Sequence, residues 1–182
     1  MRIRNGGRNL HKNLTYNEYA QEVIAQLANG GIFLTVKDPD QDRANIMTIG
    51  WGTIGYIWRK PIFLVMVRYS RHTYGLLEKA GEFTVSVPLK QDCRKELLIC
   101  GRQSGRDIDK FRECGFTPQQ GRIISTPIIQ ECPLHFECRV VYQQAMEPAQ
   151  LNNELRAKCY QTPDYHVLYY GEILASYLTK EL

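Results

Sequence analysis

The spacing of hydrophobic residues along the chain follows a helical repeat first and a strand repeat afterwards. From residue 16 to residue 27 apolar side chains recur every three or four positions, which is typical of an amphipathic helix. Thr15 and Glu18 have the spacing of a capping box at the start of this run, and Gly30-Gly31 ends it. We therefore expect a helix that begins directly after Thr15.

Strand-like segments make up much of the remaining chain, at residues 32–36, 45–58, 61–67, 82–87, 134–142 and 165–178. The run 61–67 is continuously apolar, which favours a strand that is buried on both faces. The segment 134–142 alternates instead, so we expect its apolar residues to point inward and His135 and Glu137 to point outward.

The helical segments between these strands are short. They cover residues 70–80, which Gly81 closes, and residues 91–115, which an internal loop interrupts, while residues 146–164 have the composition of a surface excursion. The order is not a regular βαβ alternation, and Gly50-Trp51-Gly52 lacks the third glycine of a dinucleotide-binding turn, which argues against a Rossmann sheet. The expected fold class is mainly β, an antiparallel barrel with peripheral helices.

Length and composition indicate one ordinary globular domain. The chain has 182 residues, of which 43% are hydrophobic and 23% charged. Residues 1–13 carry two glycines and several basic residues and predict a flexible N-terminal arm, so that residues 14–182 form the domain. No apolar run approaches the ~20 residues of a membrane helix, and no apolar region follows the first arginines as in a secretory signal. We expect no membrane association and a cytoplasmic location.

The cysteines and the charges exclude two further classes of site. Six cysteines stand at irregular spacings without a C-x-x-C pair, which predicts reduced thiols and no metal site. The net charge of +4 is mild, and no nucleic-acid-binding motif or basic helical stripe accompanies it. We therefore expect no nucleic-acid partner, and a small phosphate-bearing molecule accounts for the local basic clusters equally well.

The segment that follows the apolar run 61–67 has the features of an anion site. Ser70 is a good N-cap, and a helix N-terminus carries partial positive charge and unpaired N–H donors. Arg68 and Arg71 add charge, while Ser70 and Thr73 add hydroxyl groups. The segment predicts a phosphate site, and the alternative is a capped surface helix with two arginines in water.

Two other segments have residues that suit a ligand. In the segment 45–52, Asn45 and Thr48 can serve the polar edge of a flat heteroaromatic ring, and Met47 and Trp51 can cover its apolar end. The alternative is a barrel strand with glycine kinks and ordinary core aromatics.

The third segment, residues 100–111, is a loop with two glycines, Ser104 and several basic side chains, and it could wrap a polar or anionic ligand. Its alternative is a plain surface connection between two short helices. Cys100 has no second cysteine nearby in the sequence with which to form a disulfide, so we expect it to pack in the core.

Together and in this order, the three segments resemble the flavin reductase-like FMN-binding family, particularly its flavoredoxin-like branch. Further matching residues lie at 58–61, 82–85, 117–118 and 164–173, and the resemblance covers residues 31–175. It implies a split β-barrel that binds one FMN per subunit near a homodimer interface. Tyr69 departs from the pattern, since relatives often carry proline there.

The resemblance also implies roles for individual residues. The isoalloxazine ring would lie along Asn45, Met47, Thr48, Gly50 and Trp51; the phosphate would be held by Arg68, Tyr69, Ser70, Arg71 and Thr73; and Cys100, Ser104, Asp109 and Lys110 would come from the loop that closes the site. His166 is the candidate catalytic residue that would contact the nicotinamide or the flavin edge, and a histidine hydrogen-bonded within a strand is the alternative.

The expected activity is that of an NAD(P)H:flavin oxidoreductase, which transfers a hydride from reduced nicotinamide to FMN and passes electrons onward. The alternative is a non-catalytic FMN electron carrier that is reduced by a redox protein partner. A barrel that binds haem or a pyridoxal-type phosphate is a third interpretation. The sequence offers no obvious axial ligand for a haem.

Overall fold

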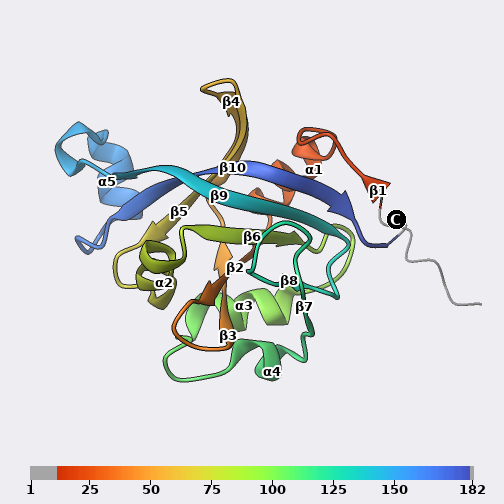
Figure 1. The fold of residues 1–182 in the computed structure, drawn as a ribbon. Coiled ribbons are helices and arrows are strands. Elements are labelled where there is room, and N and C mark those ends of the chain that lie inside the picture. The colour runs from red at the N-terminus through yellow and green to blue at the C-terminus, as the bar shows by residue number, and fades with distance from the viewer. Residues whose placement is uncertain (1–11, 181–182) are drawn as a thin grey trace, which may run out of the picture.

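The computed structural model describes residues 12–180 and is mainly β, with short helices at the periphery (Figure 1). The strands are β1 (Lys12–Asn13), β2 (Ile32–Asp38), β3 (Arg43–Ile49), β4 (Gly52–Ile57), β5 (Lys60–Arg68), β6 (Glu82–Val87), β7 (Pro118–Gln119), β8 (Ile128–Ile129), β9 (Leu134–Ala145) and β10 (His166–Leu178). The helices are α1 (Ala20–Ala28), α2 (His72–Ala80), α3 (Arg94–Arg102), α4 (Lys110–Cys114), α5 (Asn153–Cys159) and the 3₁₀ turn η1 (Pro148–Gln150). The expected fold class, mainly β with peripheral helices, is confirmed.

The order of the strands requires the main sheet to curl into a barrel. Neighbouring strands are antiparallel, and the order across the sheet is β3-β2-β6-β9-β10-β5-β4. Strands β3 and β4 therefore lie at opposite edges of the sheet, although only Gly50 and Trp51 separate them in the chain. Since the three Cα–Cα steps from Ile49 to Gly52 span at most ~11 Å, the two edges must come together at this corner. The barrel is split there.

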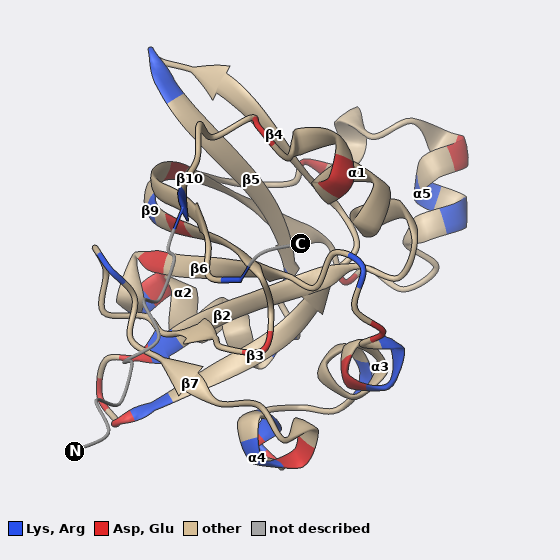
Figure 2. Cartoon of the chain, turned by 90° about the vertical axis from the view of Figure 1, so that its right-hand side faces the viewer, with Lys and Arg blue, Asp and Glu red and all other residues tan. Residues whose placement is uncertain are grey.

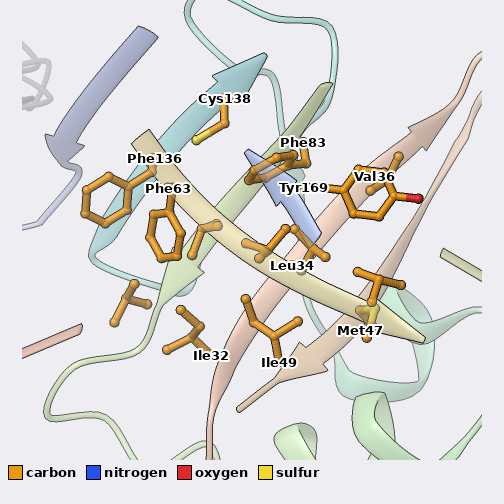
Figure 3. Close-up of a cluster of buried hydrophobic side chains, with 14 of the residues drawn as sticks. Ile32, Leu34, Val36, Met47, Ile49, Phe63, Phe83, Phe136, Cys138 and Tyr169 are labelled. Carbon is orange, nitrogen blue, oxygen red and sulfur yellow. The ribbon is translucent and has the colours of Figure 1, made fainter. Parts of the chain in front are cut away.

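The interior of the barrel is filled by apolar side chains from its inner face. Leu34, Phe63, Phe83 and Phe136 are fully buried and meet in the centre (Figure 3). The rings of Phe63 and Phe136 pack edge to face with centroids 5.3 Å apart, a favourable aromatic arrangement. Because β10 also contributes Tyr169, the core joins both halves of the sheet.

The helices cover different parts of the barrel, and their charges are mixed. Helices α3 and α4 pack on the outer face of β3, where a second cluster includes Phe33, Ile46, Leu97 and Phe111. Lys and Arg alternate with Asp and Glu on α3, α4 and α5 rather than forming a single basic stripe (Figure 2). Within residues 12–180 no helix combines the length and the apolar character needed to cross a bilayer.

The burial predicted for the outward-facing side chains was wrong in two strands, β5 and β9. β5 was expected to be buried on both faces, but Leu64 and Met66 are only half-buried on its outer side. In β9, His135 and Glu137 lie outward, opposite to the core residue Phe136 as expected, but this outer face is covered and both are fully buried. The segment between β7 and β8 covers this face, and the Glu137 carboxylate accepts hydrogen bonds from the backbone N–H groups of residues 122–124.

Two predicted helix starts were also wrong. α1 begins at Ala20, because the Glu18 carboxylate pairs with Lys12 at 2.8 Å and no side chain caps the helix. α2 begins at His72 with Arg71 as N-cap, because Ser70 Oγ donates to Asp164 Oδ2 at 2.6 Å instead. The predicted end of α2 is confirmed, since Gly81 has the left-handed conformation (φ 62°) of a C-cap.

The predicted N-terminal arm was wrong for its last two residues. Lys12 and Asn13 form β1, which pairs with β10 so that Lys12 lies opposite Leu178. Residues 1–11, the rest of the predicted arm, lie outside the described residues.

Candidate ligand site at the split of the barrel

A cavity of about 210 Å³ lies at the split, where β3 passes into β4; we call it the ring cavity. Its walls are Met47, Thr48, Ile49, Gly50, Trp51, Met66, Arg68, Arg71, Gly101 and His166. The walls thus come from β3, the β3–β4 corner, the end of β5, α3 and the start of β10. Strand pairing accounts for part of this convergence, since His166 is opposite Arg68 in the β10–β5 register.

The ring cavity combines apolar cover with a few polar groups. Met47, Trp51 and Met66 supply apolar surface, and Trp51 is 41% exposed at the rim. Thr48 Oγ1 donates to the main-chain oxygen of Leu97 at 2.6 Å, so its lone pairs are left to accept a hydrogen bond. Such a lining suits a flat ligand with an apolar end and a polar edge.

His166 adds a neutral imidazole to this wall. Its Nδ1 lies 2.7 Å from the hydroxyl of Tyr160, and its ring is tilted against Trp51 with centroids 5.1 Å apart. Burial, helped by the nearby charge of Arg68, lowers the pKa of His166 to about 4. The imidazole is therefore uncharged at neutral pH. If the phenol donates to Nδ1, the tautomer carries its proton on Nε2.

A second cavity of about 160 Å³ adjoins the first; we call it the anion cavity. It is lined by Asn45, Ser70, Arg71, His72, Thr73, Arg102, Gln103, Ser104, Gly105, Arg106 and Lys110. Three arginines, a lysine and the first residues of α2 surround one small volume. A helix N-terminus and clustered guanidinium groups are the common features of sites for phosphate.

The loop over the anion cavity packs tightly on β3. A Cβ at Gly105 would overlap the side-chain amide of Asn45, so a larger residue there would have to displace that amide. Asn45 in turn donates to Thr73 Oγ1 at 2.9 Å, which fixes β3 to the start of α2. Ser104 Oγ accepts from the backbone N–H of Arg106 at 3.2 Å.

Lys110 is the most deeply buried cation at this cavity, with only 4% of its surface exposed. Its Nζ donates to the main-chain oxygens of Ile46 at 2.8 Å and Cys100 at 3.0 Å. Burial lowers the pKa of Lys110 to about 8. The ammonium group is therefore mostly protonated at neutral pH and close to its titration range.

The two cavities meet at Arg71, which lines both. Its guanidinium is half-buried and donates to the main-chain oxygen of Cys100 at 3.3 Å. An elongated ligand with a flat ring at one end and an anion at the other would span both cavities past this side chain.

Most of the residues that the sequence pointed to lie at these cavities. At the ring cavity are Met47, Thr48, Gly50, Trp51 and His166. At the anion cavity are Ser70, Arg71, Thr73, Ser104 and Lys110.

Five residues have another position than the one expected for them. Asn45 lines the anion cavity rather than the ring cavity, and Arg68 lines the ring cavity rather than the anion cavity. Tyr69 lines neither, and its ring packs edge to face on Tyr74. Cys100 is buried behind the site. Asp109 caps α4 by accepting from the backbone N–H groups of residues 111 and 112.

Several lining residues were missed, and their signals differ. His72, Arg102, Gln103 and Arg106 lie inside segments already singled out, so neighbouring positions pointed to them. Gly101 is one of the two glycines of the predicted ligand loop, and Met66 stood in the run 61–67, which was noted only as a buried strand. Tyr160 lines neither cavity but contacts His166, and nothing in the local sequence indicated it, because it follows α5 in the expected surface excursion.

The structure gives Cys100 a neighbour that the sequence did not. Its Sγ lies 3.7 Å from Sγ of Cys114, since α3 and α4 pack together. Burial raises the pKa of both thiols, which keeps them in the unreactive thiol form. The pair therefore packs in the cluster between these helices.

Comparison with known proteins identifies related chains. Residues 24–182 match the model of the flavin reductase like domain. An uncharacterized protein of Archaeoglobus fulgidus is 29% identical over 133 residues, which cover 73% of this chain and 64% of that protein. An uncharacterized protein of Pyrococcus abyssi is 30% identical, with 77% of this chain and 69% of that protein covered. The chain thus spans just under two thirds of the first relative's length.

Solved structures show the same fold. Flavoredoxin of Desulfovibrio vulgaris (Miyazaki F) superposes with a TM-score of 0.63 and 26% identity, over 80% of this chain and 67% of that one. Flavoredoxin from Methanosarcina acetivorans gives 0.61 and 28%, over 81% and 67%. A Shewanella frigidimarina structure with a split barrel domain gives 0.61 at 17% identity, over 90% and 74%, and bears on the fold alone. The predicted split barrel is confirmed.

Proposed function

Because the chain belongs to the flavin reductase-like domain family, in its flavoredoxin-like branch, we propose that it binds FMN across the two cavities and acts as an NAD(P)H-dependent flavin oxidoreductase. The observation that carries this proposal is the junction at Arg71, where a cavity with apolar and polar walls lies beside a small cationic one. FMN has an aromatic ring system and a phosphate joined by a flexible chain, so its two ends match the two cavities.

The side chains present fit such a ligand. Met47, Trp51 and Met66 would cover the ring system, and Thr48 would accept a hydrogen bond at its polar edge. Arg71, Arg102, Arg106 and Lys110 would neutralise the phosphate, with hydroxyl groups of the same cavity as additional partners.

When bound, the flavin would supply the atom that accepts a hydride from a reduced nicotinamide and gives up electrons afterwards. The chain's own share is to orient that ring and to set the charges around it. His166, neutral at physiological pH, would offer its Nε2–H to the ring edge or to the incoming nicotinamide without adding a positive charge. Trp51, partly exposed at the rim, would border the face at which the second substrate arrives.

An electron carrier without nicotinamide activity is the second candidate. It is favoured by the 26% and 28% identity to two flavoredoxins, and it would receive electrons from a redox protein partner. One assay separates the candidates: the flavin-loaded protein is mixed with NADH or NADPH without oxygen. We expect the flavin absorption to bleach with at least one nucleotide. A protein that stays yellow with both would leave only the carrier.

We also propose that the chain works as a homodimer that pairs through the β4–β5 hairpin. This hairpin projects from the barrel (Figure 1), and Tyr56 and Trp58 at its tip are 61% and 55% exposed. Trp58 packs against Tyr142 and Tyr170, which extends one aromatic surface over β9 and β10. Light scattering should give twice the mass of one chain. For Trp58→Glu we expect the mass of a single chain, and a wild-type monomer would overturn this proposal.

A further inference from the structure

The carboxylate of Asp164 takes both hydrogen-bond donors of Ser70, a residue that lines the anion cavity. Ser70 Oγ donates to Asp164 Oδ2 at 2.6 Å, and the backbone N–H of Ser70 donates to Asp164 Oδ1 at 3.2 Å. A serine residue has no further donor. Ser70 can therefore donate to another anion only if Asp164 gives up one or both of these bonds.

The backbone around Asp164 is held in place independently of its side chain. Asp164 lies between α5 and β10, and its main-chain oxygen accepts from Arg68 Nη1 at 2.7 Å. The backbone N–H of Tyr69 donates to the main-chain oxygen of Tyr165 at 3.3 Å. These two bonds keep the segment against the turn that follows β5. The carboxylate can therefore leave Ser70 while the contact between the two segments persists.

Ser70 differs in its hydrogen bonds from other hydroxyl residues of the anion cavity. Thr73 Oγ1 accepts from the side-chain amide of Asn45 at 2.9 Å, and Ser104 Oγ accepts from the backbone N–H of Arg106 at 3.2 Å. In the described part of the chain neither of these two hydroxyl groups donates a hydrogen bond, so both can donate to a ligand. The hydroxyl proton of Ser70 is instead given to a negatively charged acceptor.

Asp164 also changes the charge that a ligand would meet. Burial lowers the pKa of Arg71, and the negative charge of Asp164 opposes this shift. The carboxylate is therefore close enough to attract the Arg71 guanidinium, which lines both cavities. A phosphate in the anion cavity would approach the same guanidinium and would be repelled by the carboxylate, because like charges repel more strongly near a protein surface than in bulk water.

We propose that Asp164 lowers the affinity of the anion cavity for phosphate, because its carboxylate competes with the phosphate for Ser70 and is displaced when the phosphate binds. This inference rests on the proposed function for the identity of the ligand, FMN. The free energy needed to displace the carboxylate reduces the free energy of phosphate binding. The protein therefore holds FMN less tightly than its arginines and lysine alone would, and bound flavin exchanges more readily with free flavin.

The test is a calorimetric titration of the flavin-free protein with FMN, with riboflavin and with inorganic phosphate. Asp164→Asn removes the charge but keeps the size and one acceptor oxygen of the side chain. We expect this variant to bind FMN and phosphate about fivefold more tightly than the wild-type protein, with riboflavin changed less than about twofold. The rate of FMN dissociation, measured by stopped-flow fluorescence, should fall by a similar factor.

Two further variants separate competition for Ser70 from a change in net charge. Asp92→Asn is the matched control, because Asp92 also accepts from a backbone N–H and pairs with Arg94 at 2.8 Å on the surface. It should change the affinity for each ligand less than about twofold. In a Ser70→Ala background the gain from Asp164→Asn should shrink to about twofold, because the hydroxyl group that Asp164 releases is missing.

The possible outcomes distinguish this inference from the proposed function. If Asp164→Asn binds FMN more weakly or equally well, the carboxylate does not compete with the phosphate, and FMN binding by the wild-type protein still stands. An equal gain for riboflavin, or an equal gain with and without the Ser70 hydroxyl group, would also overturn the inference. If no protein binds FMN but Asp164→Asn tightens phosphate binding, the proposed function fails and the competition stands. If the wild-type protein binds neither FMN nor phosphate, both fail.

Discussion

Arg68 Nη1 lies 2.7 Å from the main-chain oxygen of Asp164, across 96 residues of sequence. Its Nη2 donates to the main-chain oxygen of Cys159 at 3.0 Å, and its guanidinium stacks 5.0 Å from the centre of the Tyr160 ring. The end of β5 is thereby tied to the segment that leads into β10. Arg68 thereby fixes a wall of the ring cavity, and both of its terminal nitrogens donate to main-chain oxygens of this segment.

Replacing Arg68 should therefore weaken FMN and riboflavin alike. Arg68→Met removes the bonds that hold the wall but takes no cation from the anion cavity, so we expect the two dissociation constants to rise by factors that agree within about threefold. Calorimetric titration with both flavins measures this. A loss confined to FMN would mean that Arg68 binds the phosphate directly.

The hydrogen bond between Tyr160 and His166 should be visible in stability and in the histidine tautomer. Tyr160→Phe leaves Nδ1 without its partner in a buried place, and we expect the free energy of unfolding to fall by ~1 kcal/mol. Urea unfolding measures it. Tyr165→Phe is the control, because Tyr165 stacks on Tyr160 without a side-chain hydrogen bond of its own in the described structure, and it should stay within about 0.5 kcal/mol.

Nitrogen NMR gives the second measurement on this pair. The wild-type imidazole should be neutral between pH 6 and 8, because its pKa lies near 4. Its proton should be on Nε2, because we expect the Tyr160 hydroxyl to donate to Nδ1. The Tyr160→Phe spectrum should show both tautomers. A wild-type ring protonated on Nδ1, or spectra identical in the two proteins, would contradict the assignment.

The buried Lys110 should make FMN affinity depend on pH. Its pKa of about 8 is lowered from the ordinary value, so the ammonium charge is present at pH 7 and largely lost at pH 9. Since a phosphate is attracted to the protonated form, FMN affinity should fall about fivefold to tenfold over that range. Riboflavin should show little change.

Lys110→Met should remove most of that pH dependence, with a weaker affinity at pH 7. If the variant keeps the wild-type pH profile, another group is responsible and Lys110 serves only to hold Ile46 and Cys100.

The sequence predicted the strands and the glycine-marked ends well, because those signals are local. The alternation in β9 and the apolar run of β5 marked both segments as strands, although the burial of their outer faces differs from the prediction. Gly81 ends α2 because the left-handed conformation there favours glycine. Such features need no knowledge of the rest of the chain.

The wrong predictions share a different cause, namely a partner far away in the sequence. Glu137 is buried because its carboxylate binds backbone N–H groups of residues 122–124, and Ser70 is no cap because Asp164, 94 residues away, takes its hydroxyl. Local patterns hold no information about either contact. The candidate site was largely found through the family resemblance, while the contact of Tyr160 with His166 emerges only when the chain is folded.

The measurement that tests the central claim most directly is the ratio of riboflavin to FMN dissociation constants for the wild-type protein. The two ligands share the ring system and differ in the phosphate, which meets four cationic side chains in the anion cavity. Since charge-assisted hydrogen bonds contribute about 1.5–3 kcal/mol each, FMN should bind at least about 100-fold more tightly. Equal affinities, or the absence of binding by both, would contradict the account.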